Sequence, residues 1–298
     1  MILERFRPDW PHYLERFHAE RPGITEDLLL DCRDDAGRDP YQWLASGVTP
    51  GGRVLDLACG SGPMHGLLGP GWIGVDRSAE ELERASANDA GPVARADALA
   101  LPLPSHSVDA VVCSMALMLV SPLTRALDEI RRVLVPGGAL HVMVPARRPL
   151  TAGDTRRYLR LYLALASPAR FPPSPMRRHS TGVLSDAGFS VATVERQRFD
   201  YPLVDPASGR RLVDALYLPG VAPRRQERAS QVAQRWIGSA LGIALERIVA
   251  RCDHRGQGSA PAPSCGSTGS VDRGPPSSVG ASRPSEDGVG MSPPSSGI

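Results

Sequence analysis

The sequence contains no lysine, and all 34 of its residues in the lysine-plus-arginine count are arginines. Schiff-base catalysis and the phosphate-binding loop of nucleotide hydrolases both depend on a lysine amine, so both are excluded. The net charge of +2 over 298 residues is also close to neutral. A dedicated nucleic-acid binder carries a much stronger positive field, so we do not expect nucleic acid as a partner.

Cysteine is scarce as well. The five cysteines occur without paired or regular spacing, namely Cys32, Cys59, Cys113, Cys252 and Cys265. Zinc sites and disulfide frameworks both need such spacing, so we expect no metal and a reducing, cytoplasmic environment. Long apolar runs are missing too, both near the start, where a secretion signal would lie, and elsewhere. We therefore expect no membrane partner.

The last part of the chain lacks aromatic residues and almost all large aliphatic ones from about Asp253 onward. Serine, glycine and proline dominate there, and such a composition buries too little apolar surface to offset the entropy of ordering. We therefore predict a folded domain over residues 1–252 and a disordered Ser/Gly/Pro-rich tail over residues 253–298.

Within the predicted domain, short apolar strands alternate with helical segments. The expected strands are 53–58, 72–75, 92–96, 108–113, 139–144, 189–196 and 243–252, and the expected helices are 64–68, 79–87, 122–134, 181–187, 209–218 and 224–241. Ser78 and Glu81 predict a capping box at the start of one helix. Alternation of this kind implies an α/β fold with a doubly wound, mostly parallel, seven-stranded sheet.

Polar residues and glycines follow several of these strands. In an open α/β sheet the ligand binds at the carboxyl ends of the strands. Asp56 lies beside a glycine turn after the first strand, where it would repel a pyrophosphate but attract the ammonium and sulfonium groups of S-adenosylmethionine. Asp76 ends the second strand, where a carboxylate can accept both ribose hydroxyls. Asp97 and the Ala98 backbone follow the third, where they can bind adenine.

Four segments carry a family resemblance, namely Val54 to Gly62, Ile73 to Asp76, Ala96 to Pro102 and Leu134 to Gly138. In order and spacing they resemble successive motifs of class I S-adenosylmethionine-dependent methyltransferases, most closely the small-molecule enzymes that include quinone and natural-product methylases. The likeness covers roughly residues 40–200. It implies a Rossmann-like core with helical lid segments at 1–40, 151–178 and 205–241.

The resemblance also implies S-adenosylmethionine as cofactor and assigns parts of it to residues. It gives the methionine part to Asp56, Ala58, Gly60 and Ser114, the ribose to Asp76, and the adenine to Asp97 and Ala98. Ala58 stands where the family often has glycine. The complete expected cofactor site is Asp56, Ala58, Gly60, Gly62, Asp76, Arg77, Asp97, Ala98 and Ser114.

The acceptor is less defined than the cofactor. Met115-Ala116-Leu117, after the fourth strand, lacks the Asn-Pro-Pro-aromatic signature of methylases that act on amide or exocyclic base nitrogens. This favours a small-molecule acceptor. An NAD(P)-dependent oxidoreductase is an alternative because it shares the glycine loop and the ribose acid, although Asp56 and the absence of a Tyr-Lys pair oppose it. A non-catalytic S-adenosylmethionine-binding protein is a further alternative.

Two features of the sequence carry no functional prediction. None of the histidines stands in a spacing that identifies a catalytic base, so the catalytic residue stays unassigned, as does the oligomeric state. The segment after the fifth strand is rich in arginine, and we expect it to form a helix with a solvated basic face. Its apolar side, with Leu159, Tyr162 and Leu163, is then expected to pack on the domain.

Overall fold

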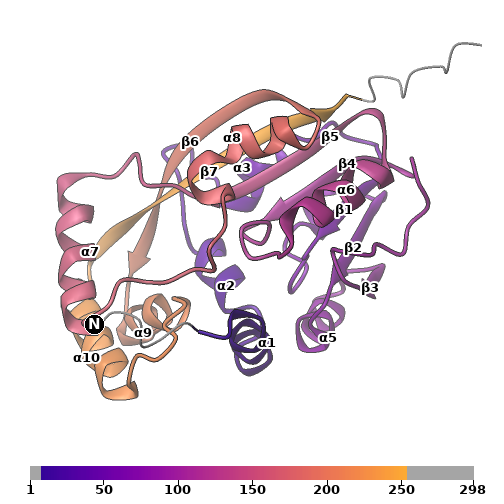
Figure 1. The fold of residues 1–298 in the computed structure, drawn as a ribbon. Coiled ribbons are helices and arrows are strands. Elements are labelled where there is room, and N and C mark those ends of the chain that lie inside the picture. The colour runs from indigo at the N-terminus through magenta and orange to yellow at the C-terminus, as the bar shows by residue number, and fades with distance from the viewer. Residues whose placement is uncertain (1–7, 254–298) are drawn as a thin grey trace, which may run out of the picture. The chain divides into compact units, whose positions relative to one another are not determined.

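The described part of the protein, residues 8–253 of a computed structural model, is built on a seven-stranded sheet (Figure 1). Its strands are β1 (Val54–Leu57), β2 (Trp72–Asp76), β3 (Val93–Arg95), β4 (Val108–Ser114), β5 (Leu134–Pro145), β6 (Phe189–Leu203) and β7 (Ser239–Cys252). They lie in the order β3-β2-β1-β4-β5-β7-β6, and only β7 runs antiparallel to its neighbours. The mostly parallel, doubly wound sheet that the sequence predicts is confirmed.

Each face of the sheet carries its own hydrophobic core, because successive side chains of a strand point to opposite faces. Leu55 and Leu57 of β1 belong to one cluster and Val54 to the other. The first cluster is closed by α6 (Leu123–Val133) and α8 (Met176–Asp186). The second is closed by α2 (Ile24–Leu30), α3 (Pro40–Ala45), α4 (His65–Leu68) and α5 (Ala79–Ala87), which precede or connect the first strands.

The long strands β6 and β7 differ most from the expected elements. They pair as an antiparallel ladder from Phe189 and Cys252 at one end to Leu203 and Ser239 at the other. The expected strand 189–196 is therefore too short, and the expected helix 224–241 is too long. That helix, α10, ends at Gln234, because the chain turns there to enter β7. The helix expected at 181–187 begins earlier, at Met176.

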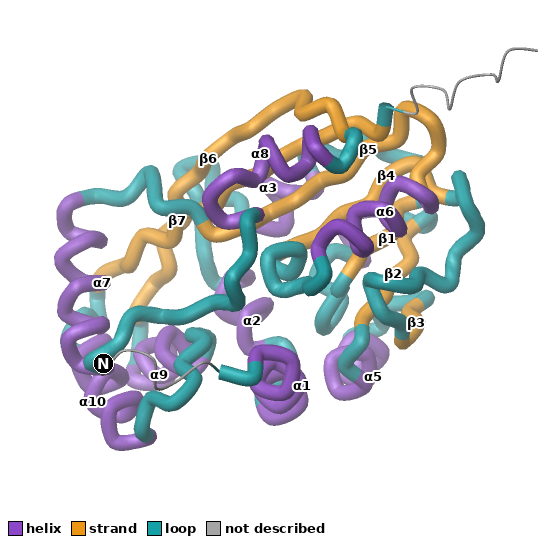
Figure 2. The backbone as a smooth tube through the Cα atoms, viewed as in Figure 1, coloured by secondary structure: helices purple, strands orange, loops and turns teal. Residues whose placement is uncertain are grey.

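Three helices, α7 (Ala152–Leu165), α9 (Pro206–Asp214) and α10 (Pro223–Gln234), gather beside the far ends of β6 and β7 (Figure 2). The predicted packing of α7 is wrong for its two leucines, whereas Tyr162 packs partly buried against the core as expected. Leu159 and Leu163 are 59% and 70% exposed, whereas Leu161 and Leu165 are fully buried. Residues four apart share one face of a helix, and here the Leu161 face meets the core. Tyr158 adds to this orientation by donating a hydrogen bond to the Gly242 carbonyl at 3.1 Å.

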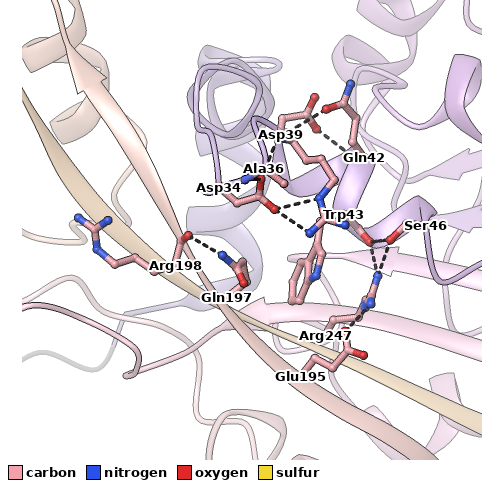
Figure 3. A network of polar contacts seen from close by, with 11 residues as sticks. Asp34, Ala36, Asp39, Gln42, Trp43, Ser46, Glu195, Gln197, Arg198 and Arg247 are labelled. Atoms are coloured by element: carbon pink, nitrogen blue, oxygen red, sulfur yellow. Dashed lines mark hydrogen bonds and ion pairs between the residues drawn. The ribbon is translucent and has the colours of Figure 1, made fainter.

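A buried arginine fastens the segment before β1 to the antiparallel edge of the sheet (Figure 3). Arg247 of β7 donates to the Trp43 carbonyl and, at 3.0 Å, to Ser46 Oγ, and it pairs with Glu195 of β6. Its guanidinium carbon lies 4.7 Å from the centre of the Trp43 ring. Cation–π stacking and charge-assisted hydrogen bonds together fix α3 against the sheet.

The helix α5 has only half of the predicted capping box. Ser78 Oγ accepts from the Glu81 backbone at 3.3 Å, as expected. The Glu81 carboxylate does not return to Ser78. It accepts instead from the Gly23 backbone at 2.9 Å and from His18 Nδ1 at 3.0 Å. Glu81 thereby ties α1 (Trp10–Glu20), which lies beside α5 in Figure 1, and the turn before α2 to the core.

The predicted disordered tail lies outside the described residues, apart from Asp253. Among residues 8–253, no helix is both long enough and apolar enough to cross a membrane.

Candidate functional site

A cavity of about 920 Å³ opens at the carboxyl ends of β1, β2 and β4. Seven of the nine predicted cofactor-site residues line it, namely Ala58, Gly60, Asp76, Arg77, Asp97, Ala98 and Ser114. They come from different strand ends and are brought together by the parallel register of β3, β2, β1 and β4. The cavity therefore lies at the point between β1 and β4 where the strand order reverses, the usual ligand site of such sheets.

The turn after β1 takes conformations that favour glycine. Ala58, Gly60 and Gly62 all have positive φ angles, of 56°, 54° and 80°. Ala58 is strained there because an alanine rarely adopts this region. Gly62 points away from the cavity: a side-chain carbon on it would collide with Ala90. Gly62 therefore packs against Ala90 beneath the cavity and does not line the cavity wall.

Asp56 does not line the cavity either. Its side chain belongs to the face of β1 that packs against Trp72, and the residue is 1% exposed. Trp72 Nε1 donates to its Oδ2 at 3.1 Å. Burial raises the pKa of Asp56 to about 7, and the Trp72 hydrogen bond offsets only part of this effect. The acid that the sequence places beside the ligand is thus sealed behind the glycine turn.

This burial gives a pH-dependent prediction for Asp56→Asn. A buried acid whose pKa is raised from 3.8 to about 7 destabilises the fold progressively as the pH rises between these values. We expect the free energy of unfolding of the variant, relative to wild type, to increase by about 1.4 kcal/mol per pH unit near pH 5 and by about half as much per unit near pH 7. Urea titrations at pH 5, 6 and 7 measure it. A difference that stays constant with pH would show that Asp56 does not titrate in this range.

Asp76 shapes the cavity as well as lining it. Its Oδ2 accepts from the Gly60 backbone at 3.0 Å and its Oδ1 from the Ser78 backbone at 2.9 Å. Asp97 lies further along the same edge, and its Oδ1 accepts from the Leu99 backbone at 2.9 Å. Both carboxylates are held by backbone donors and keep acceptor capacity, because an ionised carboxylate has about four lone-pair sites.

The opposite wall carries residues that the sequence analysis did not identify. Glu26, Tyr41 and Tyr217 line the cavity, and His18 joins them from α1. His18 Nδ1 contacts Glu81 at 3.0 Å, and its Nε2 lies 3.3 Å from the Tyr217 hydroxyl. Burial alone would lower the pKa of His18, but the hydrogen bond and charge of Glu81 outweigh it and raise the pKa.

The three expected lid segments contribute unequally to this wall. The segment 1–40 supplies most of α1 and part of α2. The segment 151–178 supplies Pro172 and Pro173, and the segment 205–241 supplies Tyr217. No sequence motif marks Glu26 or Tyr217, because their approach to the glycine turn depends on contacts between distant parts of the chain. Only α1 carries a local signal in the sequence that it faces the site, because aromatic and titratable residues, Tyr13, Phe17 and His18, lie close together in it.

Comparisons with known proteins agree with this geometry. A sequence-family profile described as "Methyltransferase domain" matches residues 55–142. An uncharacterized 37.1 kDa protein in transposon TN4556 of Streptomyces fradiae is 32% identical over 244 residues, which are 75% of this chain and 67% of the relative. A ubiquinone/menaquinone biosynthesis C-methyltransferase of Chromobacterium violaceum is 37% identical over 142 residues, 43% of this chain and 58% of the relative.

One more relative and one solved structure are similar to this chain. A 2-phytyl-1,4-naphtoquinone methyltransferase of Synechocystis is 34% identical over 111 residues, 33% of this chain and 47% of the relative. The chain thus spans about half the length of the quinone relatives that it matches. A solved structure described as "Conversion of a Disulfide Bond into a Thioacetal Group during Echinomycin Biosynthesis" shares the fold, with a TM-score of 0.51 and 18% identity over 82% of this chain and 94% of that chain.

The strand order, the cavity at the strand ends and these relatives define a Rossmann-like transferase. The chain belongs to the class I S-adenosylmethionine-dependent methyltransferases.

Proposed function

We propose that this protein transfers the methyl group of S-adenosylmethionine to a small-molecule acceptor, and that the cofactor occupies the cavity at the strand ends. One observation carries the proposal: seven residues predicted separately from sequence motifs line a single cavity. Their chemistry fits the cofactor, because Asp76, Asp97 and Glu26 line the cavity and can accept hydrogen bonds from its hydroxyl, amino and ammonium groups.

The residues suit the three parts of the cofactor in order along the sheet edge. Asp97 and the Ala98 backbone would hold the adenine, and Asp76 the ribose hydroxyls. The positive-φ turn at Ala58 and Gly60 exposes backbone that would hold the methionine part, together with Ser114 of β4. Asp56 and Gly62 act indirectly in this proposal, because they support the turn from behind. Arg77 lines the cavity at the ribose end.

The cofactor supplies an electrophilic methyl group on a sulfonium. The protein's part is to position the acceptor atom in line with the methyl–sulfur bond and to exclude water, and positioning alone supplies a large share of such a rate acceleration. The wall formed by Leu14, Met115, Leu119 and Pro172 is suited to the apolar body of an acceptor. Two relatives are named for quinone methylation, which supports small aromatic acceptors as the first class to test.

The two alternatives have less support. None of the relatives described above is named as an NAD(P)-dependent oxidoreductase. A non-catalytic S-adenosylmethionine-binding protein would share the site but not the turnover. We also propose a cytoplasmic location, because Cys32, Cys59 and Cys113 are buried as free thiols in the described fold.

Calorimetric titration of the full chain with S-adenosylmethionine, S-adenosylhomocysteine and NADPH tests the proposal. We expect both sulfur compounds to bind with a Kd below about 1 mM, within the usual range for enzyme ligands, and NADPH to give no saturable heat. Transfer of labelled methyl to a panel of hydroquinones and phenols then tests turnover. Binding of NADPH alone would overturn the cofactor assignment, whereas binding without any methylation would favour the non-catalytic alternative.

A further inference from the structure

Glu26 lies where the cavity meets the glycine turn. Residue 60 has a positive φ of 54°, and a side-chain carbon there would overlap Glu26 Oε1 and displace that carboxyl group. The other carboxyl oxygen, Oε2, is buried and has no hydrogen-bond partner among the described residues. A buried acceptor without a donor costs about 1–3 kcal/mol, so this position is one that a bound donor group would stabilise.

The charges around Glu26 suit a cationic group. Asp76 of β2 and Glu81 of α5 add negative potential, while His18 of α1 is engaged with Glu81. Burial raises the pKa of Glu26 to about 7, and the negative charge of Glu81 adds to this effect. A cation placed beside Glu26 would oppose both effects on its pKa, because opposite charge favours the ionised carboxyl.

The order in which the parts of the cofactor would lie along the cavity indicates which cationic group would meet Glu26. If Asp97 holds the adenine and Asp76 the ribose, the rest of the cofactor extends past Gly60, whose backbone amide donates to Asp76. Glu26 stands at that end of the cavity. The sequence analysis expected Asp56 to supply a negative charge there, but Asp56 is sealed in the core, and Glu26 is the carboxyl that reaches the cavity from α2.

We propose that Glu26 binds the α-ammonium group of the cofactor's methionine part. The inference rests on the proposed function, since it takes S-adenosylmethionine as the ligand. It also makes the amino-terminal segment part of the cofactor site. The turn and helix that carry Glu26 are held to α5 by Glu81 on Gly23 and by Arg84 on Asp27 at 2.6 Å, so the carboxyl is presented on a braced element.

The test compares three ligands that share the nucleoside and the sulfur atom. S-Adenosylhomocysteine carries both the amine and the carboxylate, 5′-(3-aminopropylthio)adenosine carries only the amine, and 5′-methylthioadenosine carries neither. We expect Glu26→Gln to weaken the first two roughly 10- to 100-fold, the range of a lost charge-assisted hydrogen bond, and to leave 5′-methylthioadenosine within about twofold. Calorimetry on the full chain measures all three dissociation constants.

Glu20→Gln is the matched control, because Glu20 is an exposed acid of the neighbouring helix α1 and pairs only with Arg16 in the described structure. We expect it to change none of the three constants by more than about twofold. Equal weakening of all three ligands by Glu26→Gln would overturn the inference, since it would indicate a general distortion. Unchanged constants with a slower methyl transfer would overturn it as well, in favour of a base acting on the acceptor.

A proton count provides a second readout. The groups facing Glu26 are those that share its charge interactions, namely His18, Tyr41, Cys59, Asp76, Glu81 and Tyr217. Because burial raises the pKa of Glu26 to about 7, binding of an ammonium at pH 7 should release up to about half a proton. Titrations in buffers of different ionisation enthalpy measure the release, which Glu26→Gln should abolish. If the wild type binds no ligand at all, the proposed function fails and not this assignment alone.

Discussion

Asp76→Ala is expected to weaken binding of S-adenosylhomocysteine at least about 100-fold. In the proposed site the carboxylate accepts both ribose hydroxyls, and two hydrogen bonds to a charged group contribute about 1.5–3 kcal/mol each. The same side chain accepts from the Gly60 and Ser78 backbones, so its removal also releases the glycine turn. Calorimetric titration measures the loss of affinity, and 5′-methylthioadenosine should be weakened as well because that ligand keeps the ribose.

The control for Asp76→Ala is Asp109→Asn. Asp109 lies on β4 near its amino-terminal end, away from the cavity, and pairs with Arg53 at 3.2 Å on an exposed surface. The variant removes one negative charge from the same sheet, and we expect affinity within about twofold of wild type because exposed pairs contribute little. A comparable loss in both variants would mean that Asp76 acts through net charge or folding and not through a ribose contact.

The contrast between Asp76 and Glu26 shows which parts of a site can be read from sequence. Asp76 ends an apolar strand, and a parallel sheet brings all such ends to one edge, so a local pattern was enough to place it. Glu26 reaches the same cavity only because α2 folds back over the turn after β1. That approach depends on the bond between Glu81 and Gly23, residues 58 apart in the chain, and no local spacing encodes it.

The errors in the prediction have the same physical origin. Ser78 and Glu81 stand at capping-box spacing, yet the Glu81 carboxylate bonds to Gly23 and His18 instead of to the Ser78 backbone. Contacts with distant residues therefore replaced the local hydrogen bond that the spacing predicts. Leu159 and Leu163 were assigned to the buried side of their helix, but Leu161 faces the core. Both leucine pairs have helical spacing, so periodicity alone could not choose between them.

A buried charge network attaches the inserted helix α7 to the antiparallel strands. Asp154 is 1% exposed and caps α7 through Thr151, whose backbone and hydroxyl donate at 2.9 and 2.7 Å. Arg198 of β6 donates to it at 2.8 Å and the Gly242 backbone of β7 at 2.8 Å. Glycine is required at 242, because a side-chain carbon there would collide with Arg198 and Asp154.

Asp154→Ala is expected to destabilise the fold by about 3–5 kcal/mol, the usual cost of removing one partner of a buried ion pair. Burial alone would raise the pKa of Asp154, but the donors from Arg198, Thr151 and Gly242 hold it well below its ordinary value. A lowered acid pKa stabilises the fold above the unfolded pKa near 4 and loses this effect as the pH falls through the folded pKa. Urea unfolding at pH 7 therefore measures the whole contribution.

Asp200→Asn is the control for Asp154→Ala, because it changes the exposed carboxylate that pairs with Arg198 and leaves the buried one in place. Asp200 also pairs with Arg198, at 2.7 Å, but its side chain is 45% exposed. We expect this variant to lose no more than about 1 kcal/mol, since water screens exposed pairs. If the two variants cost the same, burial is not what makes Asp154 important. If only Asp154→Ala is destabilised, the buried contacts of Asp154 are what hold α7 against the sheet. The segment after α7, which brings Pro172 and Pro173 to the cavity, then starts from a helix with a fixed position.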